Sequence, residues 1–271
     1  MAALRWAPET PNFAIPHMNS LERTLVTKAG YDHGWEVVVE ATAQRVRLAS
    51  ALHRAHLEVL EGQSDGERWR VRIGSGALGR ELRRVRGAEC GDGDLIGVAT
   101  ERDLGLLLHD AAKLARALPD APEARFAKTV AAELAERKIG ATEVERLVKQ
   151  RVGQDIFRES LMDYWGGACA VTGIAVPELL RASHAKAWAE CATDAERLNV
   201  YNGFLLCAHL DALFDSHLLT FTDSGDALFA AGIDDDIRPR LGLTSTLKLR
   251  WLAPEHREFL AWHRARFESR K

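Results

Sequence analysis

The sequence predicts an α+β protein, and three observations support that fold class. Strand-like segments gather within residues 1–100, segments with helical spacing of apolar residues follow between residues 104 and 165, and short strands and helices alternate after residue 166. The chain has 271 residues, of which 46% are hydrophobic and 28% are charged. This length suits one large or two modest domains, and the composition suits a buried core.

Composition and patterning exclude several classes of protein. No apolar run approaches the roughly 20 residues that a membrane-spanning helix needs, and residues 1–16 lack the apolar segment of a secretory signal. We therefore expect a cytoplasmic protein without membrane contact. The net charge of −3, from 36 basic and 39 acidic residues, confines any nucleic-acid contact to local patches. Reduced thiols are favoured over disulfides for the four cysteines, Cys90, Cys169, Cys191 and Cys207.

The first domain, predicted at residues 1–103, is a mixed α/β unit for which we consider a DNA-reading role. Asn19 or Ser20 can cap a helix over residues 17–31, which Gly30 ends. A short helix is expected at residues 76–85. The β-rich segments predict strands at residues 35–40, 46–49, 56–61 and 68–73.

Basic residues concentrate between positions 68 and 86, which hold seven arginines and one acid, Glu81. Strict alternation in the strand at 68–73 predicts that its arginines face one side, and the next helix adds three more. Two interpretations stay open: a solvated strand and helix face, or a surface that binds DNA phosphates. Six of the seven are the candidate DNA contacts: Arg68, Arg70, Arg72, Arg80, Arg83 and Arg84.

A helical connector is predicted at residues 104–141. Apolar residues keep helical spacing from Leu104 to Leu118, and Pro119 ends that helix. The Ala-rich segment 121–138 predicts another helix. Thr142 and Glu145 then form a capping-box pattern, which predicts a helix to about Trp165 and opens a second domain at residues 142–271.

The segment 166–222 contains the residues that suggest chemistry. A short strand at 179–184 ends at His184, and a second strand is expected at 202–207. A helix at 208–215 would place Asp211 and Asp215 one turn apart on one face. Strands at 218–221 and 227–230 flank a hairpin turn, and a helix is expected at 255–267, with His256 and His263 at the surface.

These motifs resemble the HNH endonuclease family, in its restriction-type branch, whose core is a ββα-metal unit. The lead-in segments at 152–158 and 169–173 agree as well, so that the resemblance extends over about residues 142–267. It implies a divalent-metal-dependent endonuclease that hydrolyses DNA phosphodiester bonds, in restriction or defence against foreign or modified DNA. The matching segments are Arg-Ala-Ser-His-Ala-Lys-Ala-Trp at 181–188, Glu-Arg-Leu-Asn at 196–199, Asn-Gly-Phe-Leu-Leu-Cys at 202–207 and Leu-Asp-Ala-Leu-Phe-Asp at 210–215.

Phosphodiester hydrolysis needs a base that accepts a proton from water near neutral pH, and His184 is the predicted base. The charge that develops on the phosphate needs a hard cation such as Mg²⁺ or Mn²⁺, for which the Asp211 carboxylate is the predicted ligand. By the resemblance, Asn202 keeps the two strands and the imidazole oriented. Arg181 is a candidate for holding a phosphate oxygen, and Lys186 for a DNA contact.

The sequence departs from the commonest family pattern in its acidic residues and its cysteines. Ser183 stands where an acidic metal ligand usually precedes the base, and Asp211 stands where a second histidine is usual. The metal shell could be completed by Asp215, by His209 or by water, in that order of preference. Related proteins with zinc use paired Cys-x-x-Cys knuckles, but here Thr172 and Leu210 replace the second cysteines. We therefore expect no structural zinc.

Two other functions are compatible with these motifs. The missing acid before His184 suits a non-catalytic DNA-binding or regulatory protein that keeps the HNH scaffold. A toxin delivered to rival cells is a third interpretation, against which the absence of a secretion signal and of repeats argues. One ββα-metal unit cuts one strand, so double-strand cleavage would need a homodimer or two encounters.

Overall fold

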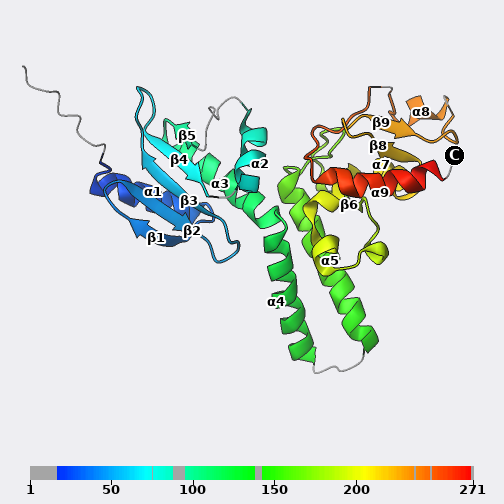
Figure 1. Ribbon diagram of the computed structural model, residues 1–271, viewed down its shortest axis with the longest axis horizontal. Helices are drawn as coiled ribbons and strands as arrows, with labels where there is room; N and C mark the ends of the chain where they lie inside the picture. The colour runs from blue at the N-terminus through cyan, green and yellow to red at the C-terminus, as the bar shows by residue number, and fades with distance from the viewer. Residues whose placement is uncertain are drawn as a thin grey trace, which may run out of the picture.

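The computed structural model of the protein describes residues 17–74, 76–87, 95–137, 142–234, 236–244 and 246–269. Within these ranges two units lie side by side (Figure 1). We call them the sheet unit, from α1 to α3, and the nuclease-like unit, from η2 to α9. A pair of long helices projects from between them. Helices and strands are both abundant, which confirms the predicted α+β class. Cys90, Lys138 and Gly140 lie outside the described residues. No helix in the described part is long and apolar enough to cross a membrane.

The sheet unit contains an antiparallel meander in the order β1-β2-β3-β4-β5. Helix α1 begins after Asn19, whose side chain accepts a hydrogen bond from the backbone N–H of Glu22 at 2.9 Å, as the predicted cap requires. The last strand, β5, was not predicted. The elements are α1 (Ser20–Asp32), β1 (Val37–Ala41), β2 (Arg45–Ala49), β3 (His56–Glu61), β4 (Trp69–Ile73), α2 (Gly76–Arg86), β5 (Leu95–Val98) and α3 (Glu101–Ala117).

The core of this unit forms between one face of the sheet and its helices. Trp69 and Val71 of β4 are fully buried together with Leu104 and Leu108 of α3. Helix α3, which we predicted as part of a connector, is therefore packed as part of the sheet unit. The domain boundaries themselves stay a prediction.

The two long helices are α4 (Asp120–Arg137) and α5 (Thr142–Tyr164). They run antiparallel (Figure 1), and a small apolar cluster holds them together. The Thr142 side chain of the predicted capping box lies outside the described residues. The cluster consists of Phe126, Val130, Val148, Val152, Ile156 and Leu198.

The nuclease-like unit confirms the predicted strand, strand and helix. Strand β6 (Leu180–His184) pairs antiparallel with β7 (Gly203–Cys207), and α7 (Ala208–Asp215) packs against both. The remaining elements are η2 (Pro177–Leu179), η3 (Trp188–Glu190), α6 (Asp194–Leu198), η4 (Val200–Asn202), β8 (Leu219–Phe221), β9 (Ala227–Phe229), α8 (Ile237–Arg240) and α9 (His256–Glu268).

Helix α2 of the sheet unit joins the two units. The Arg84 guanidinium lies 3.9 Å from the centre of the Trp251 ring, and the Tyr201 hydroxyl donates to Glu81 at 3.4 Å. Tyr201 is the neighbour of Asn202 in the chain. The sheet unit therefore contacts the segment that leads into β7.

Two histidines of α9 are buried, so the prediction that they lie at the surface was wrong. His256 stacks on Phe204 with the ring centres 5.4 Å apart, and His263 stacks on Phe214 at 3.8 Å. Burial lowers the pKa of His256 to about 3 and that of His263 to about 4. Both rings are therefore neutral in the folded protein at pH 7.

Because the pKa values of these two histidines are lowered in the folded state, we expect the free energy of unfolding to decrease as the pH falls. Between pH 6.5 and about 4 the unfolded chain binds protons at both residues, whereas the folded protein does not. The free energy of unfolding should fall by about 1.4 kcal/mol per pH unit for each histidine in this window. Urea unfolding at pH 7, 6 and 5 measures this slope. His256→Phe should reduce it, whereas His17→Phe, at an exposed position, should not.

Candidate functional site

His184 ends strand β6, and its ring is packed between two aromatic side chains. It stacks on Phe157 of α5 with the ring centres 3.7 Å apart, and it meets Trp188 of η3 edge to face at 5.8 Å. Its Nε2 lies 2.9 Å from the backbone carbonyl oxygen of Arg197. Because a carbonyl oxygen only accepts hydrogen bonds, Nε2 must carry the proton, and Nδ1 keeps a lone pair.

The surroundings of His184 keep its imidazole neutral. Burial lowers its pKa to about 4, and the hydrogen bond to the Arg197 carbonyl opposes that shift. At pH 7 the ring is therefore unprotonated at Nδ1. Its lone pair is the group that the predicted base would use, and the role of His184 as that base stays a prediction.

Gly203 allows the close packing around His184, which it faces directly across the two-stranded sheet. A Cβ atom at position 203 would lie 2.4 Å from the Ser183 carbonyl oxygen and 2.6 Å from Cζ of Phe157. Neither a strand backbone nor a buried ring can move away without disturbing the site. Only glycine fits at this position.

We expect Gly203→Ala to destabilise the protein by about 1–3 kcal/mol, because the added methyl group overpacks the site. Urea unfolding followed by circular dichroism measures this change. Gly232→Ala is the matched control, since a Cβ atom there meets nothing within 4 Å. A Gly203→Ala protein as stable as this control would show that the strand can shift at no cost.

Asn202 is fully buried and connects the loop after β6 to β7. Its Nδ2 donates to the carbonyl oxygens of Lys186 at 3.2 Å and Glu196 at 3.1 Å, and its Oδ1 accepts from the Lys186 N–H at 2.8 Å. Glu196 directly precedes Arg197, the residue whose carbonyl orients His184. Asn202 thus holds together the loop that carries the Arg197 carbonyl, and its orienting role stays a prediction.

Asp211 of α7 lies on the side of β6 that is opposite to His184. Its Oδ1 accepts a short hydrogen bond from the hydroxyl of Ser183, which is itself 1% exposed. No described residue donates to Oδ2. Side chains alternate along a strand, so Ser183 and His184 leave β6 in opposite directions. The structure therefore places the carboxylate and the imidazole on two sides of the same strand end, without a direct contact.

The other two predicted metal ligands are Asp215 and His209, both on α7. Partial burial of its carboxyl group and the charge of Asp211 raise the pKa of Asp215 to about 6, which indicates that the two carboxylates are close. His209 is exposed in the first turn of α7. Across the described ranges, no three His, Cys, Asp or Glu side chains are grouped for a metal ion.

Arg181 and Lys186 are engaged with neighbouring groups of the protein. Nη1 of Arg181 donates to the carbonyl oxygens of Glu178 and Leu180, each at 2.9 Å, at the start of β6. Nζ of Lys186 forms an ion pair with Glu196 at 2.5 Å. The structure shows no contact of either side chain with His184 or Asp211, and their DNA contacts stay predictions.

Several arginines of residues 68–86 form ion pairs with acids from other elements. Arg72 donates to Glu58, which lies opposite it on β3, at 3.0 Å. Arg68 contacts Glu22 of α1 at 3.0 Å and Glu101 of α3 at 3.1 Å. Arg68 lies just before β4, and its partners come from two helices, whereas the partner of Arg72 comes from the neighbouring strand.

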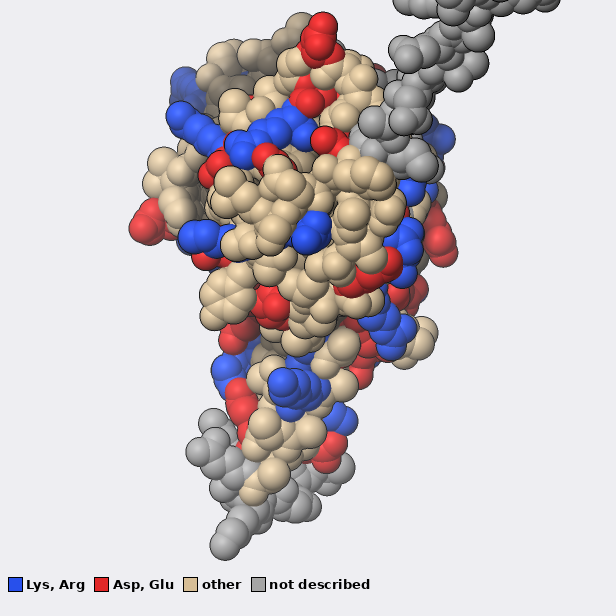
Figure 2. All heavy atoms as spheres, turned by 90° about the vertical axis from the view of Figure 1, so that its left-hand side faces the viewer, with Lys and Arg blue, Asp and Glu red and all other residues tan. Residues whose placement is uncertain are grey.

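The helix α2 continues this pattern. Arg80 pairs with Glu255 of the nuclease-like unit, and Arg84 pairs with Glu81. Figure 2 shows Lys and Arg side chains interleaved with Asp and Glu over one side of the molecule. Because Arg68, Arg72, Arg80 and Arg84 are paired with acids, the segment is not an uninterrupted cationic surface. Its role in DNA binding, and that of Arg70 and Arg83, stays a prediction.

The cysteines near the site are buried. Cys169, Cys191 and Cys207 form no disulfide, and the backbone N–H of Cys207 donates to Sγ of Cys169 at 3.3 Å. Thr172 donates its N–H to the same sulfur at 3.5 Å. The turn at 169–173 thus packs against the junction of β7 and α7, and two thiols there are too few for a tetrahedral zinc site.

The sequence motifs did not identify three contributors to the site. Phe157 and Trp188 enclose the His184 ring, and the Arg197 carbonyl fixes its orientation. All three residues lie within or beside the matching segments at 152–158, 181–188 and 196–199. Their position in these segments could have indicated Phe157 and Trp188. The role of the Arg197 carbonyl could not be predicted, because every residue has a backbone carbonyl.

Comparison with known proteins agrees with this geometry. Residues 169–222 match the protein-family model described as HNH endonuclease. The match contains β6, β7, α7 and β8, together with His184, Asn202 and Asp211. A search of curated proteins finds none that matches the chain.

Proposed function

Because the chain carries a domain of the HNH endonuclease family at residues 169–222, which indicates nuclease activity on nucleic acid, we propose that it is a divalent-metal-dependent DNA endonuclease. One observation carries this proposal. A neutral, oriented imidazole and a carboxylate with an available oxygen flank the same end of β6. A role in restriction or defence against foreign or modified DNA follows from the family resemblance alone.

In this proposal His184 removes a proton from the attacking water. Nδ1 accepts the proton while Nε2 keeps its hydrogen bond to the Arg197 carbonyl, which also stabilises the imidazolium that forms. Phe157 and Trp188 prevent the ring from turning away. Asn202 acts as a positioning residue, because it holds the loop that presents the Arg197 carbonyl.

The residues around Asp211 fit a hard cation such as Mg²⁺ or Mn²⁺, which binds one or two carboxylates and keeps several waters. Asp211 offers its Oδ2, and Asp215 adds a second carboxylate one turn later. A bound cation would stabilise the negative charge on the phosphate and on the departing oxygen. Ser183, which stands where an acidic metal ligand is usual, instead orients the Asp211 carboxylate through its hydroxyl.

Plasmid nicking by the purified protein tests the proposal. Supercoiled DNA should be converted to the nicked form with Mg²⁺ or Mn²⁺, and EDTA should abolish the conversion. A folded protein that leaves plasmid intact under all metal conditions would contradict it.

A second candidate is a non-catalytic DNA-binding protein that keeps the scaffold. The hydrogen bond from Ser183 to Asp211 favours it, because a serine occupies the place of a metal-binding acid. DNA binding without metal-dependent nicking would support this alternative. A homodimer, if present, would be detected by light scattering in the same preparation.

A further inference from the structure

A cavity of about 300 Å³ lies where the sheet unit meets the nuclease-like unit. Helices α2 and α3 line it on one side, and the C-terminal end of α5 and residues 250–251 line it on the other. This volume is at the lower end of the range for small-molecule binding sites. The proposed hydrolysis uses none of the residues in this lining.

The acidic side chains of this lining are neutralised by arginines that lie outside it. Asp110 pairs with Arg86 at 3.1 Å. Asp163 pairs with Arg116 at 3.2 Å. Neither carboxylate is therefore available to neutralise the cations of the cavity.

The lining contains three cations, Arg84, Lys113 and Arg250. Arg84 pairs with the buried Glu81 at 2.7 Å. Across the described ranges, no acid lies within ion-pair distance of Lys113 or Arg250. The cavity therefore has a surplus of two positive charges.

The two arginines of the lining approach the same aromatic ring. The guanidinium carbons of Arg84 and Arg250 lie 3.9 and 4.5 Å from the centre of the Trp251 ring. Nη2 of Arg250 donates to the carbonyl oxygens of Trp165 and Ala168, which fixes this side chain and leaves other N–H groups for a ligand. Burial and the charge of Arg84 lower the pKa of Arg250. An anion near both guanidinium groups would offset their repulsion.

Two buried donors in the same lining have no acceptor among the described residues. They are the Tyr164 hydroxyl, in a side chain that is 1% exposed, and the indole N–H of Trp165, which is fully buried. Burying a donor without an acceptor is unfavourable. A ligand that supplies acceptors and negative charge is therefore favoured over one that supplies donors.

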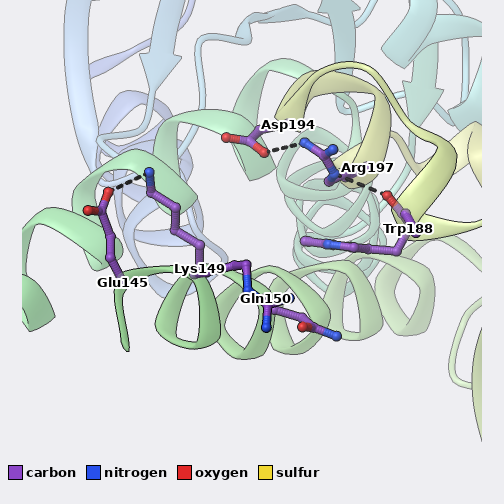
Figure 3. Close-up of a pocket in the computed structure, with 8 residues that line it drawn as sticks. Glu145, Lys149, Gln150, Trp188, Asp194 and Arg197 are labelled. Atoms are coloured by element: carbon purple, nitrogen blue, oxygen red, sulfur yellow. Dashed lines mark hydrogen bonds and ion pairs between the residues drawn. The ribbon is translucent and has the colours of Figure 1, made fainter. Parts of the chain in front are cut away.

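The cavity between α5, η3 and α6 has no such surplus of charge (Figure 3). Each cation of that lining lies within ion-pair distance of an acid, and dashed lines in Figure 3 mark two of these pairs. The pairs are Lys149 with Glu145 at 2.7 Å, Arg197 with Asp194 at 2.8 Å and Arg146 with Glu143 at 3.7 Å.

We propose that the cavity between the two units binds a phosphate group, held by Lys113, Arg84 and Arg250. A phosphate presents acceptors and negative charge, and a planar guanidinium can bind two of its oxygens. Lys113 and Arg84 belong to the sheet unit and Arg250 to the nuclease-like unit, so the phosphate would bridge the units. It can belong to the DNA backbone or to a free nucleotide. This site goes beyond the proposed cleavage site and shares no residue with it.

Isothermal titration calorimetry of the full chain with pyrophosphate and with thymidine monophosphate tests the proposal, with EDTA present. Lys113→Gln should weaken binding by about 10-fold to 100-fold, because it removes one charged donor. Lys113→Arg keeps the charge and should keep most of the affinity. Lys128→Gln is the matched control, because Lys128 is a helical lysine of α4 that also has no acid within ion-pair distance in the described part.

A fluorescein-labelled DNA duplex, followed by fluorescence anisotropy in EDTA, distinguishes the two sources of phosphate. If the site holds a backbone phosphate, Lys113→Gln should reduce the slope of log affinity against log salt by about 0.9. Pyrophosphate should then compete with the duplex. If the site holds a free nucleotide, thymidine monophosphate should bind and the slope for the duplex should not change.

Acetylation of lysines in the wild-type protein, followed by mass spectrometry, gives a second measurement that needs no variant. Pyrophosphate, thymidine monophosphate or the duplex should slow the modification of Lys113 and leave that of Lys128 unchanged. Unchanged modification of Lys113 with all three probes would overturn the proposal. Unchanged binding of all three probes by Lys113→Gln would also overturn it.

These experiments separate this proposal from the proposed nuclease function. Phosphate binding in EDTA does not require cleavage, so it can be present in a protein that fails to nick plasmid. Conversely, metal-dependent nicking by a protein whose phosphate binding does not depend on Lys113 would leave the nuclease proposal intact and remove this one.

Discussion

His184→Ala is expected to lower the rate of plasmid nicking by a factor of about 10² to 10⁴, the usual contribution of a general base. The imidazole is neutral at pH 7 because burial lowers its pKa to about 4, and its Nε2 is fixed by the Arg197 carbonyl. Alanine supplies neither the lone pair nor the fixed geometry. Initial rates of conversion from supercoiled to nicked DNA, at saturating Mg²⁺, measure the loss.

A control must separate lost chemistry from lost packing, because the ring stacks on Phe157. His184→Phe keeps an aromatic ring in that place and should unfold in urea near the wild-type midpoint, yet it should be as inactive as His184→Ala. His17→Ala, at an exposed position far from the site in the sequence, should keep full activity. Nicking by His184→Phe at the wild-type rate would exclude His184 as the base.

The local elements of this protein were largely predictable from its sequence. Strand β7 and helix α7 follow from an apolar run and from helical spacing, and both occur within one residue of the predicted bounds. Asn19 caps α1 because a short polar side chain before a helix satisfies a backbone N–H. Strand β5 was missed because its four residues are too few to show the alternation of apolar and polar side chains that indicates a strand.

The tertiary contacts were not predictable in this way. The arginine-rich segment suggested a cationic surface, but its acidic partners come from remote positions, such as Glu22 for Arg68 and Glu255 for Arg80. His256 was expected at the surface. It is buried because α9 packs it onto Phe204. Residue type and local spacing carry no information about such pairings.

The same limit applies to the candidate site. The motifs indicated His184, Asn202 and Asp211, and the structure places all three in one ββα unit. They did not indicate that Asp211 is bound to Ser183, because that contact depends on how α7 docks against β6. The departure at Ser183 therefore makes the metal ligands the part of the proposal that most needs a direct test.

Asp211→Asn is expected to lower nicking by a factor of about 10² or more, because a cation at a phosphate contributes several kcal/mol to the reaction. Asparagine has almost the same shape, and its side-chain oxygen can still accept the hydrogen bond from Ser183. The fold should therefore persist while the charge is lost. Mn²⁺ binding, followed by electron paramagnetic resonance of the free ion, should weaken in parallel with activity.

Asp215→Asn provides the comparison within the same helix. Asp215 is more exposed than Asp211 and has no hydrogen bond to β6, so its replacement should weaken Mn²⁺ binding less and lower nicking less. If the two variants reverse this order, Asp215 holds the cation and Asp211 supports Ser183. If both variants bind Mn²⁺ like the wild type, neither carboxylate is a ligand, and the non-catalytic alternative gains the stronger support.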